Sequence, residues 1–166
     1  MVLCFGGSLG ALKLNEAFAQ MIPNAQKDGV SLIIGTGSRY HEDFLTKIKD
    51  YAFDSNQIRI TQYIDDMPTV LAACDVAVTR AGAMTISELC AIKKPSVLIP
   101  SPNVTANHQE KNAHALVTKG GAAKISETDL TGEGLYRTVY SLISNPQKLS
   151  NENQAYVAMV RIEIIE

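Results

Sequence analysis

The residues best suited to hold a charged small molecule form a glycine-rich run near the amino terminus. Phe5–Ala11 reads FGGSLGA and directly follows the apolar run Val2–Phe5. Glycines let a ligand approach the backbone, and a helix that begins after them offers free N–H groups to a phosphate, with Ser8 as a hydroxyl donor. A glycine-rich turn without a ligand is the alternative. The GGxxG spacing, with no GK[ST] after it, disfavours NAD and ATP.

A second loop with small residues precedes another expected helix. Thr79–Glu88 reads TRAGAMTISE and follows the apolar run VAVT. A diphosphate could again lie against N-terminal helix amides, and the carboxylate of Glu88 could accept two hydrogen bonds from a ribose diol. The spacing of Thr85 and Glu88 also matches a capping box. From the sequence both interpretations of Glu88 stay open.

A third loop is long and polar. Pro100–Asn112 reads PSPNVTANHQEKN, and its amide and imidazole groups can donate to and accept from sugar hydroxyls; these are on Asn107, His108, Gln109 and Asn112. A solvated loop with a helix N-cap is the alternative.

The segment Tyr63–Met67, YIDDM, is a smaller feature. Ile64 could offer a flat base an apolar wall and backbone groups. Asp65 or Asp66 is expected to cap the short helix that follows, and Pro68 suits the first turn of that helix.

The elements that would position these loops alternate along the chain. Apolar runs predict strands at Val2–Phe5, Ser31–Ile34, Ile58–Thr61, Val76–Thr79, Ser96–Ile99 and Ala122–Ile125. Periodic segments predict helices at Leu12–Ile22, Tyr40–Tyr51, Met67–Ala73, Thr85–Ile92, His108–Lys119 and Gly134–Ser144. This alternation predicts an α/β fold, a three-layer, Rossmann-like doubly wound parallel sheet of order 3-2-1-4-5-6. Ligands bind such sheets at the carboxyl ends of the strands, where all three loops lie.

Composition narrows the class of protein. The 166 residues fit one domain, 1–166, with 46% hydrophobic and 19% charged residues. The formal net charge of −2 predicts no general attraction to nucleic acid or anionic membrane. The three cysteines, which lie in apolar runs without a CxxC pair, are expected to be buried thiols, and no metal site is expected.

The two ends of the chain suggest a longer natural protein. The chain opens directly in an expected strand and shows neither a secretory signal nor a run of about 18 apolar residues that could span a bilayer. It ends in an apolar tail, Met159–Glu166, without a cap. We expect the natural chain to begin further upstream.

Taken together, the motifs resemble one family. FGGSLGA, YIDDM, RAGAMTISEL, KKPSVLIP and NHQEKNA followed by GGAA occur in this order in the C-terminal domain of the MurG glycosyltransferases, from about Val2 to Leu149. The resemblance implies one half of a two-domain GT-B fold that binds UDP-N-acetylglucosamine. It also implies that the complete protein converts lipid I to lipid II with inversion at the sugar carbon and without a DxD-held metal or other cofactor.

The resemblance also implies roles for individual residues. Ile64 would contact uracil and Glu88 would hold the ribose hydroxyls. The phosphates would lie by the first loop, at Gly7, Ser8, Leu9 and Gly10. The diphosphate and sugar would meet the start of the next helix at Ala83, Met84 and Thr85, after the partly structural Arg80. The N-acetylglucosamine hydroxyls would be bound by Gln109 with His108 beside it, where some members have paired glutamines.

The family's acceptor loops, membrane-facing patch and proposed base belong to an N-terminal half that these residues do not include. We therefore name no catalytic residue and expect donor binding without turnover. The family implies a cytoplasmic protein, at the cytoplasmic face of the inner membrane when complete, and the open cleft face suggests a weak homodimer. The catalytic subunit of the dolichol-linked N-acetylglucosaminyltransferase and a non-catalytic nucleotide-sugar module are the alternatives.

Overall fold

The sheet is parallel throughout and has the predicted strand order. A computed structural model of the chain describes residues 1–103 and 107–145. Its strands pair in the order β3-β2-β1-β4-β5-β6, so the prediction of 3-2-1-4-5-6 is confirmed. The strands are β1 (Val2–Phe5), β2 (Leu32–Gly35), β3 (Ile58–Thr61), β4 (Val76–Thr79), β5 (Ser96–Leu98) and β6 (Ala122–Lys124). The predicted strands agree with these to within one residue at each end.

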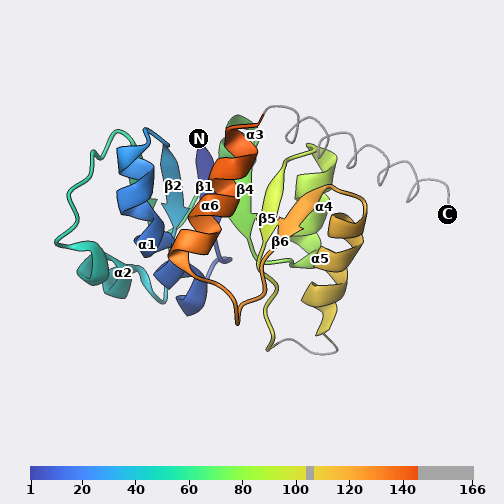
Figure 1. The fold of residues 1–166 in the computed structure, drawn as a ribbon. Coiled ribbons are helices and arrows are strands. Elements are labelled where there is room, and N and C mark those ends of the chain that lie inside the picture. The colour runs from blue at the N-terminus through green and yellow to red at the C-terminus, as the bar shows by residue number, and fades with distance from the viewer. Residues whose placement is uncertain (104–106, 146–166) are drawn as a thin grey trace.

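Helices connect successive strands and cover both faces of the sheet (Figure 1). They are α1 (Leu12–Lys27), α2 (His41–Ile48), α3 (Met67–Ala73), α4 (Ala83–Ala91), α5 (His108–Thr118) and α6 (Gly132–Ile143). The apolar residues of α1, α2 and α6 pack in one core, and those of α3, α4 and α5 pack in a second core on the opposite face. The three-layer architecture predicted from the sequence is therefore confirmed.

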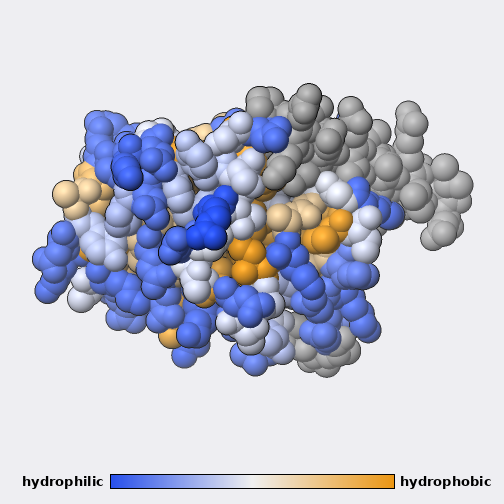
Figure 2. All heavy atoms as spheres, in the orientation of Figure 1, coloured by the Kyte–Doolittle hydropathy of each residue, from blue (hydrophilic) through white to orange (hydrophobic). Residues whose placement is uncertain are grey.

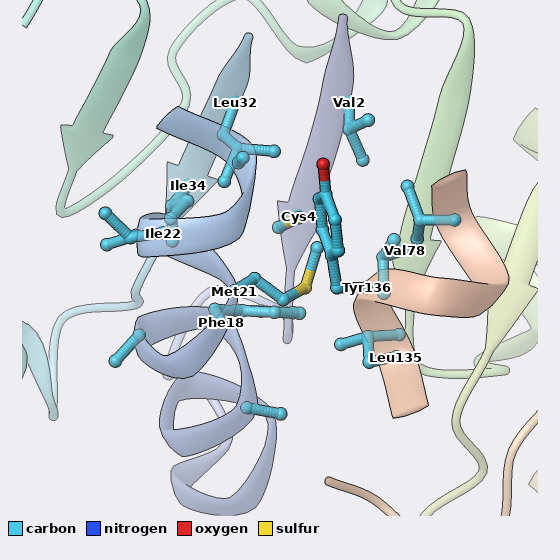
Figure 3. Packing of buried hydrophobic residues seen from close by; sticks show 14 of the residues in the cluster. Val2, Cys4, Phe18, Met21, Ile22, Leu32, Ile34, Val78, Leu135 and Tyr136 are labelled. Atoms are coloured by element: carbon cyan, nitrogen blue, oxygen red, sulfur yellow. The ribbon is translucent and has the colours of Figure 1, made fainter. Parts of the chain in front are cut away.

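Alternation along the strands divides the buried side chains between the two cores. Val2 and Cys4 of β1 belong to the first core, whereas Leu3 and Phe5 belong to the second. Figure 3 shows the first core: α1 and α6 meet over the central strands, and Phe18 of α1 lies fully buried at their contact. All three cysteines are buried, as expected, and none of them forms a disulfide within the described part of the chain.

Several helix ends differ from the prediction. The expected first helix stops at Ile22, but α1 runs through Pro23 to Lys27. Proline removes one backbone donor and clashes with the preceding turn, so the sequence argues for a stop. The buried Ala25 and the packing of α1 against α6 favour continuation instead. Helix α6 begins two residues before the expected Gly134, with Thr131 as its N-cap accepting from the backbone N–H of Gly134.

Local capping explains other boundaries. Asp66 accepts a hydrogen bond from the backbone N–H of Thr69 at 3.2 Å, so the predicted cap of α3 is confirmed. Lys94, which follows α4, donates from Nζ to the backbone carbonyls of Ala72 and Cys74. It therefore stabilises the carboxyl end of α3.

One part of the sheet surface is apolar. Figure 2 shows hydrophobic atoms beside α6, over β5 and β6. Ala123 of β6 and Ile125 just after it are partly buried and pack against the first core.

Within the described residues, no helix is long and apolar enough to cross a membrane. The tail expected at Met159–Glu166 lies outside the described residues.

Candidate functional site

The glycine-rich loop after β1 is held by the segment that follows β2. The backbone N–H of Ser38 donates to the carbonyl of Ser8 at 3.1 Å, and that of Arg39 donates to the carbonyl of Leu9 at 3.3 Å. Gly10 has a φ of +84° and Gly37 a φ of +80°, and a Cβ on either residue would lie 2.1 Å from the backbone of the other segment. Glycine is therefore required where the two segments touch.

Buried polar groups fix the position of Thr36, the residue before Gly37. The side-chain nitrogen of Asn15 in α1 donates to the carbonyl of Thr36 at 2.8 Å, and Asn15 is only 3% exposed. The hydroxyl of the fully buried Thr36 lies 2.8 Å from Nδ1 of His41 and 3.2 Å from the carbonyl of Thr61. The segment that contacts the glycine-rich loop is therefore fixed by hydrogen bonds to α1 and to the end of β3.

A cavity of about 210 Å³ opens on one side of this loop. Gly7 and Ser8 form one wall, Ile64 contributes an apolar surface and Glu88 brings a carboxylate. The remaining lining comes from Phe5, Gly35, Gly37, Gln62, Tyr63 and Met67. These residues come from the carboxyl ends of β1, β2 and β3 and from α3 and α4. An apolar wall with a few polar groups is typical of a small-molecule site.

The capping-box interpretation of Glu88 is wrong. Helix α4 begins at Ala83 with Gly82 as its N-cap, which makes no side-chain cap hydrogen bond. The helix thus starts two residues before the predicted start at Thr85. Thr85 and Glu88 both lie inside it, and Thr85 is not the N-cap. Glu88 is exposed at the cavity, where its carboxylate can accept hydrogen bonds from a ligand.

A second cavity, of about 400 Å³, lies on the other side of the glycine-rich loop. Gly6 and Gly10 line it from the loop, and Gln109 lines it from the start of α5. Its other lining residues are Ala11, Leu12, Lys13, Tyr40, Arg80, Ser101, Asn103 and Glu127. Hydroxyl, amide and charged groups dominate this lining, and such groups suit a ligand rich in hydroxyls.

The polar residues of the third loop have separate tasks. Gln109 accepts a hydrogen bond through Oε1 from the backbone N–H of Ser101 at 2.9 Å, which orients its amide toward the cavity it lines. Asn112 donates to the carbonyl of Ala81 at 3.0 Å and so joins α5 to the loop before α4. His108 is exposed at the first position of α5. Residues 104–106 of this loop lie outside the described residues.

The guanidinium of Arg80 is bound by other groups of the protein. Its Nη1 donates to the carbonyls of Ile99 and Pro100, both at 3.2 Å, and its Nη2 forms an ion pair with Glu127. The side chains of Arg80 and Glu127 are 15% and 16% exposed. The partly structural role expected for Arg80 is therefore present.

Seven of the predicted site residues line the two cavities: Gly7, Ser8, Ile64 and Glu88 in the first, and Gly10, Arg80 and Gln109 in the second. The other five are outside both linings: Leu9, Ala83, Met84, Thr85 and His108. Among these, Leu9 is 65% and Met84 is 80% exposed. Both are apolar residues at the rim of the sheet's carboxyl end.

Glu127 is the main lining residue that sequence reasoning missed. It comes shortly after β6, and its position at the carboxyl end of a strand was the available signal. Among the described residues, no group of three or more His, Cys, Asp or Glu side chains gathers to hold a metal ion.

Known proteins similar to this chain include bacterial N-acetylglucosamine transferases. The chain is 44% identical over 150 residues to a UDP-N-acetylglucosamine–N-acetylmuramyl-(pentapeptide) pyrophosphoryl-undecaprenol N-acetylglucosamine transferase of Bacillus cereus, covering 90% of this chain. It is 43% identical over 157 residues to the transferase of that name from Oenococcus oeni, covering 93% of this chain. The chain spans 41% and 42% of the lengths of these relatives.

The fold is also that of a solved transferase. The crystal structure of Acinetobacter baumannii MurG matches with a TM-score of 0.76 and 26% identity, over 93% of this chain and 44% of that one. This match confirms the prediction of one half of a GT-B glycosyltransferase. Residues 1–163 match the model of the glycosyltransferase family 28 C-terminal domain, and the chain therefore belongs to that family.

Proposed function

We propose that this chain is the donor-binding domain of an N-acetylglucosaminyltransferase and that it binds UDP-N-acetylglucosamine. The observation that carries the proposal is the position of the glycine-rich loop between two unlike cavities. One cavity has an apolar wall and a carboxylate, and the other has amide and hydroxyl groups. A diphosphate lying over the loop would therefore have its nucleoside on one side and its sugar on the other.

Each part of this ligand has a suitable partner. Ile64 and its backbone would contact the uracil, and the exposed carboxylate of Glu88 would accept hydrogen bonds from the two ribose hydroxyls. The phosphates would lie near Gly7 and Ser8, close to the amino end of α1, where the helix dipole favours negative charge. Gln109 would bind hydroxyls of the sugar.

The same arrangement supports the chemistry of transfer. When an acceptor hydroxyl attacks the sugar carbon, the bond to the diphosphate breaks and UDP leaves with an added negative charge. Free amides of the loop and at the amino end of α1 would stabilise that charge. The attacking hydroxyl must also lose its proton to a base. We assign no base to this chain and propose that it comes from another part of the complete protein.

The names of the relatives support a role in the conversion of lipid I to lipid II. We propose that the complete protein carries out this reaction at the cytoplasmic face of the membrane and that this chain alone binds donor without turnover. We also propose that residues 1–166 form one domain. A weak homodimer through the open face of the site stays a prediction.

Calorimetric titration of the 166-residue chain with UDP-N-acetylglucosamine, UDP, UDP-glucose and NAD tests the proposal. We expect binding of the uridine nucleotides, strongest for the N-acetyl sugar, and none of NAD. Glu88→Gln should weaken every uridine nucleotide by roughly tenfold or more, because a neutral amide replaces the carboxylate that accepts two hydrogen bonds.

Glu42→Gln is the matched control, since Glu42 is an exposed acidic residue in the first turn of α2 and lines neither cavity. Equal affinity for NAD and UDP, or full affinity in the Glu88 variant, would contradict the assignment. Binding of donor with no transfer even in the complete protein would favour the non-catalytic nucleotide-sugar module. Transfer to a dolichol-linked acceptor rather than lipid I would favour the other alternative enzyme.

A further inference from the structure

The guanidinium of Arg80 joins three strand ends just beyond the point where their pairing stops. The paired register of β4 and β5 ends at Thr79 and Leu98, and the last bond there runs from the N–H of Ile99 to the carbonyl of Thr79 at 2.9 Å. Arg80 is the next residue of its chain segment. It reaches the carbonyls of Ile99 and Pro100 after β5 and the carboxylate of Glu127 after β6.

The clamped backbone holds a residue of the second cavity. Ser101 follows Pro100 directly, and its N–H donates to the side-chain oxygen of Gln109. A continuous chain of contacts therefore leads from Glu127 through Arg80 and the Ile99–Pro100 carbonyls to the amide of Gln109. Gln109 uses one acceptor within the protein and keeps two N–H donors on Nε2.

Glu127 provides the negative charge that balances the guanidinium of Arg80. A guanidinium that is 15% exposed next to a diphosphate site would be attracted to the phosphates and could leave the two carbonyls. The ion pair with Glu127 offsets this positive charge and keeps the guanidinium beside the two carbonyls. Removing either partner leaves the charge of the other largely buried and without its counterion.

We infer that Glu127 is a positioning residue: through Arg80 it fixes the Ile99–Ser101 backbone and thereby orients Gln109 toward the sugar of the donor. This inference rests on the proposed function. It assigns Arg80 to the sugar side of the site as a clamp and not to the diphosphate as a ligand. Glu127 then affects the sugar, whereas the nucleoside cavity, to which Ile64 and Glu88 belong, is independent of it.

Two measurements on Glu127→Gln test this assignment. The first is hydrogen exchange at the Ser101 amide without ligand, which should become faster because the clamp is weaker. The second is titration with UDP and UDP-N-acetylglucosamine. Affinity for UDP should stay as in the unmodified chain, while the preference for the N-acetyl sugar over UDP should fall by roughly tenfold, as for one lost oriented hydrogen bond.

Glu133→Gln is the control, because Glu133 forms an exposed ion pair with Arg137 on α6, with both side chains 77% exposed. It should leave exchange and both affinities unchanged. Arg80→Lys keeps the charge but loses the fork, so it should reproduce the effects of Glu127→Gln. The double variant should be no worse than the stronger single one, since both changes break one clamp.

Unchanged exchange at Ser101, or equal loss of affinity for UDP and UDP-N-acetylglucosamine, would overturn the inference. Additive effects of the two substitutions would overturn it too, since Glu127 would then act on the sugar without Arg80. If the unmodified chain binds neither nucleotide, the proposed function fails and the sugar role fails with it. Exchange at Ser101 would still decide whether the clamp exists. Should Glu127→Gln not fold, Arg80→Lys provides the same two readouts.

Discussion

Replacing Gly10 with alanine should disrupt the loop between the two cavities. A Cβ at Gly10 would lie 2.1 Å from the carbonyl oxygen of Thr36 and 3.1 Å from its carbonyl carbon. Since carbon and oxygen rarely approach closer than about 3.3 Å, one backbone would have to move by roughly 1 Å. Thr36 cannot move freely, because its N–H donates to the carbonyl of Thr61 at 3.0 Å and its own carbonyl accepts from Asn15.

The cost has two sources. The left-handed φ of +84° at Gly10 is unfavourable for alanine, by about 1–2 kcal/mol. Forcing a methyl group against fixed backbone costs a further ~1–3 kcal/mol, as for other overpacked sites. We therefore expect the free energy of unfolding to fall by about 2–5 kcal/mol and UDP binding to be lost, because the loop that would face the phosphates is displaced.

Gly7→Ala separates the two sources. Gly7 is in the same loop and has a φ of +94°, but a Cβ there would meet nothing within 4 Å. Only the conformational cost of about 1–2 kcal/mol should then appear. Urea unfolding followed by circular dichroism gives the free energy of unfolding of each variant, and calorimetry gives the UDP affinity. If the two variants lose equal stability, the close contact between Gly10 and Thr36 is not a constraint and the reasoning is wrong.

Three further results are expected. Asp66→Ala should lower the free energy of unfolding by about 1 kcal/mol through loss of the α3 N-cap, whereas Asp65→Ala should leave it unchanged, and urea unfolding measures both. Burial, and then the hydrogen bond to Asp28, raise the pKa of Tyr136, so its folded state keeps a proton that the unfolded state loses above about pH 10. The free energy of unfolding should thus fall as the pH rises above that value, and it should fall less steeply in the Tyr136→Phe variant. Equal pH dependence of stability in the two proteins would show that Tyr136 is not the cause. Burial also raises the pKa of the Cys4 thiol. Because all three cysteines are buried, a thiol reagent at pH 8 should label none of them in the folded chain and all of them in urea.

The strands were readily predicted because their signal is local. Six short apolar runs separated by periodic polar segments can hardly form anything but a parallel sheet covered on both sides. The strand order then follows from handedness and from the rule that connections do not cross. Asp66 was likewise identified as a candidate cap, because an N-cap depends on residues only three positions away.

The errors fall where distant residues decide the outcome. Pro23 is a local signal to stop, and only the packing of α1 on α6 shows why the helix continues. The spacing of Thr85 and Glu88 fits a capping box, but α4 begins at Ala83, which leaves the carboxylate exposed at the cavity.

The sheet, its strand order and the three loops at the carboxyl ends of its strands could be predicted from the sequence, because periodicity and glycine spacing are properties of neighbouring residues. How those loops divide between two cavities, and which of their polar side chains bind other parts of the protein, depends on contacts between distant segments. Arg80 and Glu127 are 47 positions apart, and no local pattern links them. Their pairing arises because β4, β5 and β6 end side by side in the folded sheet.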